Sequence, residues 1–189
     1  YVEHLRVHHK WVGTDRDPAT AKYGENLYGF FIRSVFGQIT SAWQVESDRL
    51  KKEGSKPFGS RNYVLVNIAL LGIFYALIVL VFGKIALLAF ALQSLTANFL
   101  LEYTNYIEHY GLSRNDNERV NETHSWQTDK VISRFILIDL SRHSDHHFYA
   151  SKPYHTLLTF EKSPVLPGGY ASAIYLALIP PIWFHVIHK

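Results

Sequence analysis

The residues best suited to chemistry are three histidines in the stretch 142–147, which reads RHSDHH. His143, His146 and His147 stand at positions i, i+3 and i+4, so on a helix they project from one face. Imidazole nitrogens bind iron, zinc, copper and nickel. The stretch therefore predicts one wall of a metal site.

Two further groups of histidines lie elsewhere in the chain, His4 with His8 and His9, and His109 alone. Because the chain contains no cysteine, disulfides, thiolate sites and iron–sulfur clusters are excluded. Seven histidines exceed the capacity of one tetrahedral zinc ion, so they indicate two metals, and a set of nitrogen ligands is consistent with iron. The other four histidines are isolated in sequence and are expected to be hydrogen-bonding or surface groups.

Three carboxylates stand directly beside these histidines: Glu3, Glu108 and Asp145. A metal-bound imidazole usually donates its second ring N–H to a carboxylate or a carbonyl. We predict that these three side chains orient the ligands through such hydrogen bonds. The alternative is that they are ordinary charges on exposed turns.

The elements that must position these groups are apolar helices. The mean hydropathy of −0.04 hides two uncharged runs, which predict membrane-spanning helices over 62–82 and 85–104. Only Gly83 and Lys84 separate the two runs, so we expect a transmembrane helical hairpin. Lysine and arginine flank its outer ends, and by the positive-inside bias these ends, with all seven histidines, lie on the cytoplasmic side.

Three further segments have a helical or apolar pattern, and the first of them is expected to lie at the membrane interface. Residues 24–53 form an amphipathic pattern, 131–140 form a short apolar helix, and 171–187 form an apolar run broken by Pro180 and Pro181. We expect this last run to be an interfacial or re-entrant segment. The net charge of +3 and the pI near 9.0 suit a lipid bilayer or an acidic protein partner and are too mild for nucleic acid.

Three motifs carry a resemblance to a known family. Residues 3–9 read EHLRVHH, 105–112 read NYIEHYGL and 140–147 read LSRHSDHH. They resemble the histidine motifs of the integral-membrane di-iron hydroxylases and desaturases, and in particular the alkane 1-monooxygenases, whose HYG motif the acyl desaturases lack. The tail also resembles this family, with LPGGY at 166–170 and LIPP at 178–181. Val7 stands where the family has glycine, and Ser141 where it has glutamine, so we expect altered packing there.

The resemblance implies a single fatty acid desaturase/alkane hydroxylase-like domain over 1–189, part of a bundle of six spans. The seven histidines would be seven of nine ligands to two non-haem iron ions. The other two ligands belong to a motif of the form HExxxH, which we expect upstream of Tyr1 together with four spans. The chain is therefore expected to be an internal or C-terminal part of a longer protein, inactive by itself.

The implied reaction hydroxylates the terminal methyl group of medium-chain n-alkanes: R–CH3 + O2 + 2 electrons + 2 protons gives R–CH2OH + H2O. Rubredoxin, reduced by rubredoxin reductase, would supply the electrons to an enzyme in the bacterial inner membrane. A set of basic side chains is expected to suit this acidic carrier: Lys10, Arg49, Lys51, Lys52, Arg114, Arg142 and Lys152. The positive-inside bias alone explains the same charges.

Two other readings remain open. The chain could be a related enzyme that acts on xylene-type methyl groups or on fatty acyl chains as a hydroxylase or desaturase. It could also be a membrane metal-binding protein without catalytic activity.

Overall fold

The computed structural model describes residues 2–189, so Tyr1, the first residue of the expected domain, lies outside the described residues. Its regular elements are helices, together with one isolated bridge between Gln127 and Val165. In chain order they are η1 (His4–His8), α1 (His9–Trp11), α2 (Leu27–Lys52), α3 (Tyr63–His109), α4 (Val131–Ile136), α5 (His143–Phe148), η2 (Tyr154–Thr156), α6 (Tyr170–Ala177) and α7 (Pro180–Ile187). The all-α prediction is confirmed for these residues.

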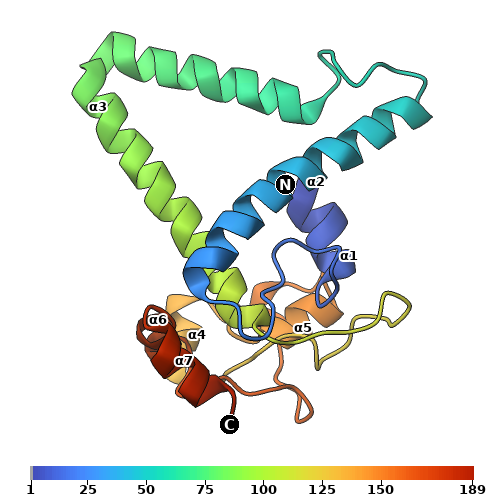
Figure 1. Cartoon of the computed structure of the whole chain (residues 1–189), viewed down its shortest axis with the longest axis vertical. Coiled ribbons are helices and arrows are strands. Elements are labelled where there is room, and N and C mark those ends of the chain that lie inside the picture. The colour runs from blue at the N-terminus through green and yellow to red at the C-terminus, as the bar shows by residue number, and fades with distance from the viewer. Residues whose placement is uncertain (1) are drawn as a thin grey trace.

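The longest element, α3, consists of two arms that meet at Gly83 (Figure 1). Gly83 has φ 83° and ψ 177°, a conformation open to glycine and costly for a residue with a Cβ. Phe74 and Phe90 contact each other across the bend, with ring centroids 5.3 Å apart, and beyond them the arms diverge. By length and composition, α3 is able to cross a membrane.

Helix α2 forms the third side of a triangle with the two arms, from the lower end of the second arm to the neighbourhood of the start of the first (Figure 1). A buried polar cluster ties it to the second arm. Glu102 on α3 accepts hydrogen bonds from Ser34 and from Gln38, the latter at 2.8 Å, both on α2. Asn26 begins α2 by accepting from the backbone N–H of Gly29 at 2.9 Å, as an N-cap does. Residues 27–52 form one continuous helix, as the amphipathic pattern over 24–53 predicted.

The base of the molecule gathers the last turns of α3, the start of α2, and helices α6 and α7 around one apolar core (Figure 1). Tyr106 and Tyr110 of the α3 end pack on Trp183 of α7, with ring centroids 5.9 and 5.5 Å apart. Pro180 begins α7, so the double proline interrupts the final apolar run as expected.

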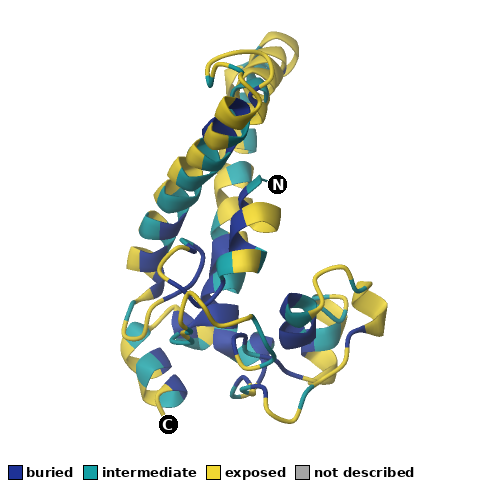
Figure 2. Ribbon diagram, turned by 90° about the vertical axis from the view of Figure 1, so that its right-hand side faces the viewer, coloured by how far each residue is buried: buried dark blue, intermediate teal, exposed yellow. Residues whose placement is uncertain are grey.

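The apolar side chains are distributed unlike those of a water-soluble protein. Both arms of α3 are largely exposed, whereas burial concentrates at the base around the histidines (Figure 2). Over most of its length, the apolar surface of α3 is not covered by other parts of residues 2–189. Lipid or further helices would cover this surface.

Candidate metal centre

Four histidines from three separate segments meet in one buried group. One ligand nitrogen from each lies within 4.8 Å of the others, and all four side chains are buried: His8, His109, His143 and His147. His109 is fully buried at the end of α3, and its Nε2 lies 3.3 Å from Nε2 of His143 on α5. We name this set the four-histidine group.

The other three predicted ligands form a second, more exposed group next to the first. His4, His9 and His146 also place their ligand nitrogens within 4.8 Å of one another. Nε2 of His4 lies 3.1 Å from Nε2 of His9. The rings of His9 and His147 stack with centroids 4.7 Å apart, so this three-histidine group adjoins the four-histidine group.

The backbone of the first motif explains how neighbouring histidines serve different groups. Residues His4–His8 form a π-helix, in which hydrogen bonds run from i to i+5, and His9 begins α1. On an α-helix, residues five apart would point about 140° away from each other. The wider turn lets His4 and His9 face each other, while His8 points into the buried group. Val7, at the family's glycine position, is buried on this helix.

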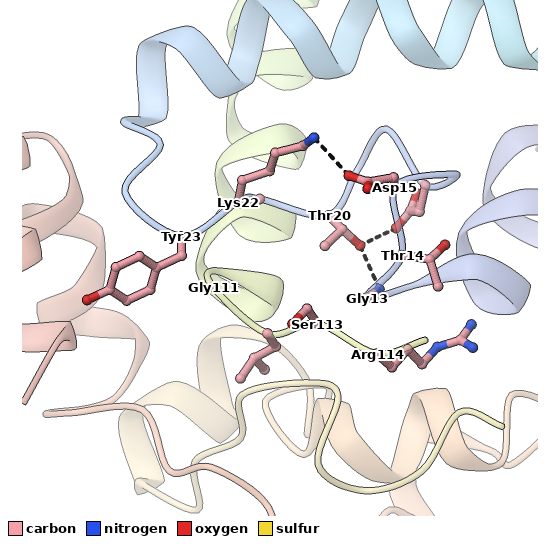
Figure 3. A pocket seen from close by; sticks show the side chains of 12 residues that line it. Gly13, Thr14, Asp15, Thr20, Lys22, Tyr23, Gly111, Ser113 and Arg114 are labelled. Carbon is pink, nitrogen blue, oxygen red and sulfur yellow. Dashed lines mark hydrogen bonds and ion pairs between the residues drawn. The ribbon is translucent and has the colours of Figure 1, made fainter. Parts of the chain in front are cut away.

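The carboxylate that orients His8 belongs to Asp17, which was not among the residues predicted from the sequence. Asp17 is buried, and its Oδ2 accepts from Nδ1 of His8 at 2.9 Å and from the hydroxyl of Thr20 at 2.7 Å. A carboxylate only accepts, so Nδ1 of His8 carries the proton and Nε2 is left with its lone pair. Thr20 in turn accepts from the backbone N–H of Gly13 at 2.9 Å, beside a cavity of about 190 Å³ (Figure 3). The only sequence signal for this role was the Asp–Pro turn at 17–18.

Glu108, next to His109 in sequence, lies beside the four-histidine group, but its carboxylate meets the nitrogen of His143 that faces His109 and not the second ring N–H expected from the sequence. Its Oε2 is 3.1 Å from Nε2 of His143, and its Oε1 accepts from the hydroxyl of Tyr170 at 2.8 Å. Tyr170 is the first residue of α6 and lies 62 residues after Glu108 in sequence. No local sequence pattern predicted this contact. Nδ1 of His109 faces the carbonyl of His124, 3.4 Å away.

The two other predicted carboxylates are buried but have different surroundings. Asp145 accepts from Lys152 and, at 2.6 Å, from the backbone N–H of Leu158, which ties α5 to the following loop. Glu3 lines an apolar cavity of about 440 Å³ beside the first arm of α3. Within residues 2–189 its carboxylate has no hydrogen-bond partner, and burial raises its pKa to about 7.

Burial holds His4, His9, His143 and His147 in their neutral, metal-binding form. Burial, with like-charged neighbours adding to it, lowers the pKa of His4 to about 4 and of His9 to about 3. The same causes lower the pKa of His143 and His147 well below the usual 6.5. At neutral pH their lone pairs are therefore free for a metal.

The unpaired nitrogens fit metal ions. Among residues 2–189, the buried Nε2 atoms of His8 and His147 have no hydrogen-bond partner, although buried polar atoms usually do. Two imidazole nitrogens on one tetrahedral metal at about 2.1 Å would be about 3.4 Å apart. The separations of 3.3 and 3.1 Å between paired Nε2 atoms approach this value. Both groups offer imidazole nitrogens, which suit iron as well as zinc and copper, and the Glu108 carboxylate lies beside the four-histidine group.

Five of the seven basic side chains expected to receive an electron donor are held in ion pairs or hydrogen bonds within residues 2–189: Arg49, Lys51, Arg114, Arg142 and Lys152. Arg114 is the clearest case, because it donates to the carbonyls of Lys10 and Val12, both at 2.6 Å. It thereby ties the segment after His109 to the segment after the first motif. Arg114, Arg142 and Lys152 therefore stabilise the loops around the metal centre, whereas Arg49 pairs with Glu46 and Glu53 near the other end of α2.

Comparison with known proteins agrees with this arrangement. The sequence model of the fatty acid desaturase family matches residues 1–187. The alkane 1-monooxygenase of Acinetobacter baylyi is 39% identical over 193 residues, covering 100% of this chain and 47% of that protein. Alkane 1-monooxygenase 1 of Pseudomonas aeruginosa is 41% identical over 192 residues, covering 96% and 49%.

A third relative is named for a different substrate class. The xylene/toluene monooxygenase hydroxylase component XylM of Pseudomonas putida is 27% identical over 188 residues, covering 100% of this chain and 51% of that protein. The chain spans about half the length of the relatives that it matches. The chain belongs to the fatty acid desaturase family, and relatives 35–41% identical to it over nearly its whole length are alkane 1-monooxygenases.

Proposed function

We propose that the protein containing this chain is a non-haem di-iron monooxygenase that hydroxylates the terminal methyl group of medium-chain n-alkanes to 1-alkanols. The observation that carries the proposal is the pairing of the four-histidine and three-histidine groups, which adjoin each other at the end of a long apolar helix. Similarity to alkane 1-monooxygenases supports the substrate class.

The two groups would each hold one iron ion, and the pair would supply the activation of O2. His8, His109, His143 and His147 would hold one ion, and His4, His9 and His146 would contribute to the other. The second group offers one histidine fewer, so the two ligands implied upstream of Tyr1 belong there in this proposal.

The surrounding side chains would position the ligands and keep water away. Asp17 fixes the tautomer of His8 through its Nδ1. Tyr170 holds the Glu108 carboxylate beside Nε2 of His143, on the side of that ring that would face the metal. Glu108 is buried and lies within reach of the four-histidine group, so it is placed to hold a proton there. The apolar arms of α3 would span the bacterial inner membrane as a hairpin, with this centre on the cytoplasmic side and the hydrocarbon substrate arriving from the bilayer.

Electrons would come from rubredoxin, reduced by its reductase. Of the predicted basic side chains, Lys10 lies close to the first histidine motif, with its ammonium 4.8 Å from the ring of Trp11. It would be an exposed contact for an acidic carrier.

The test is metal and product analysis of the full-length protein in lipid nanodiscs. We expect two irons per chain and 1-octanol from octane when O2 and reduced rubredoxin are supplied. The variant H109A removes one ligand of the four-histidine group, and it should lose iron and product together. A full-length protein that binds a single zinc and gives no alcohol would refute the proposal and favour a non-catalytic metal-binding protein.

A second candidate substrate is an aromatic methyl group, favoured by the similarity to the xylene/toluene component. Competition between octane and p-xylene in the same assay separates the two. A fatty acid in a third reaction tests the acyl substrates of the wider family. Desaturated acyl chains as the sole product would replace the hydroxylase proposal with a desaturase.

A further inference from the structure

The short helix α4 and the bend after it carry an apolar surface that faces outward. Its residues are Val131, Ile132, Phe135, Ile136 and Ile138, and we name them the α4 patch. Phe135 is 86% exposed and Val131 80%. The proposed metal centre does not use these side chains.

The polarity of α4 is inverted relative to a helix on a water-soluble protein. Its inward side presents Ser133, which is buried and accepts from the backbone N–H of Tyr170 at 3.0 Å. An amphipathic helix in water buries its apolar side and exposes its polar side. An outward apolar face of this kind marks a contact with another apolar phase.

The bend that ends α4 also turns an apolar side chain outward. Ile138 has φ 50° and Asp139 has φ 64°, although a β-branched residue rarely adopts positive φ. The bend is held by an ion pair of 2.5 Å between Arg134 and Asp139 and by a hydrogen bond from the N–H of Asp139 to the carbonyl of Arg134. Such a conformation persists only where its surroundings hold it.

The position of α4 points to a lipid surface. It packs against the start of α6, where Tyr170 reaches Glu108 at the end of α3 (Figure 1). The α4 patch therefore lies level with the end of the helix that is long enough to cross a membrane. This is the depth at which an interfacial helix places its apolar face.

The charges around the patch fit phospholipid headgroups. Asp139 is paired with Arg134, and Asp129 is paired with Arg142 at 2.7 Å, so neither carboxylate is left to repel phosphate. Lys130 is exposed and has no ion pair among residues 2–189. Basic side chains beside an apolar face favour a bilayer surface.

We propose that the α4 patch inserts into the phospholipid bilayer at the membrane interface. It thereby anchors the segment that leads, five residues after Ile138, to the ligand His143. The contact would hold one wall of the metal centre directly against the phase in which hydrocarbons dissolve.

The experiment uses a fluorescent label on single cysteines, since residues 1–189 contain none. In the full-length protein, with any cysteine elsewhere replaced by serine, F135C carries a bimane label in nanodiscs. N117C, on an exposed polar loop, is the matched control, and V131C is a second site should F135C fold poorly. Lipids with a doxyl quencher near the headgroup report insertion, and iodide reports contact with water.

We expect the doxyl lipid to quench the label at 135 and at 131 strongly and iodide to quench it weakly, with the reverse at 117. Quenching of the label at 135 by iodide, as at 117, would show that the patch faces water and would overturn the proposal. Protection from both quenchers would show that another part of the protein covers the patch, which also overturns it. Neither readout depends on activity, so failure here leaves the proposed hydroxylase function untouched.

Discussion

Replacing Asp17 with asparagine should weaken metal binding at the four-histidine group more than at the three-histidine group. The carboxylate uses both oxygens, accepting from His8 and Thr20 at Oδ2 and from the N–H of Ala19 at Oδ1. Asparagine has the same shape but one acceptor oxygen, so one buried donor would face its NH2 group. The proton on Nδ1 of His8 would lose its charged acceptor, and Nε2 would be a weaker and less well-oriented ligand.

The expected magnitude follows from the contacts that are lost. A hydrogen bond to a charged group contributes about 1.5–3 kcal/mol. Loss of such an outer partner of a metal-bound histidine usually lowers metal affinity about 10- to 100-fold, which corresponds to about 1.4–2.8 kcal/mol. The two energies agree. In D17N, the chelator concentration that removes one of the two irons should therefore be about 10- to 100-fold lower than in the unaltered protein.

The assay is chelator competition on full-length protein loaded with iron. For each of the two irons, it measures the chelator concentration at which half of the metal has been released. Asp15 supplies the control, because it lies on the same turn but pairs with Lys22 on the surface (Figure 3). D15N should release both irons as the unaltered protein does. Equal midpoints for D17N and D15N would refute the role assigned to Asp17.

Three further predictions follow from the backbone and from burial. G37A should also weaken iron binding, because its new Cβ would stand 2.7 Å from the Cβ of Pro18 and would displace the turn that carries Asp17. G72A is the control: its Cβ would meet nothing within 4 Å, so its iron content should stay unchanged. G83A should lower the thermal unfolding midpoint, through a strain of about 1–3 kcal/mol at its positive φ. Since burial lowers the pKa of His143 and His147 below 6.5, unfolding of the metal-free protein exposes groups that bind protons more tightly. These two histidines alone should therefore lower its stability by about 2 kcal/mol between pH 6.5 and 5.5. His4 and His9, whose pKa burial also lowers, add to this fall, and Glu3, whose pKa burial raises, opposes it. A stability that does not fall over this range would contradict the prediction.

Much of the fold could be predicted because its signals are local. Two uncharged runs separated by Gly83 predicted the two arms of α3, and Pro180 marked the break between α6 and α7. The predicted helix over 131–140 ended early, at Ile136, because Ile138 and Asp139 adopt positive φ. A β-branched isoleucine rarely adopts that conformation, and the ion pair and backbone hydrogen bond between Arg134 and Asp139 hold it here.

Six of the seven candidate ligands were evident from the spacing of histidines, since residue type and helical period determine which rings can share a face. His109 stands alone in sequence, and its place at the end of the second apolar run singled it out. The division of the seven between two groups was not evident. His8 and His9 are adjacent in sequence yet belong to different groups, because the π-helical turn and the packing of α5 decide where each ring points. Asp17 and Tyr170 were missed for the same reason. By itself, the sequence determined the chemistry available to this protein, and only the tertiary structure decided which atoms meet, because those contacts join segments that no local pattern connects.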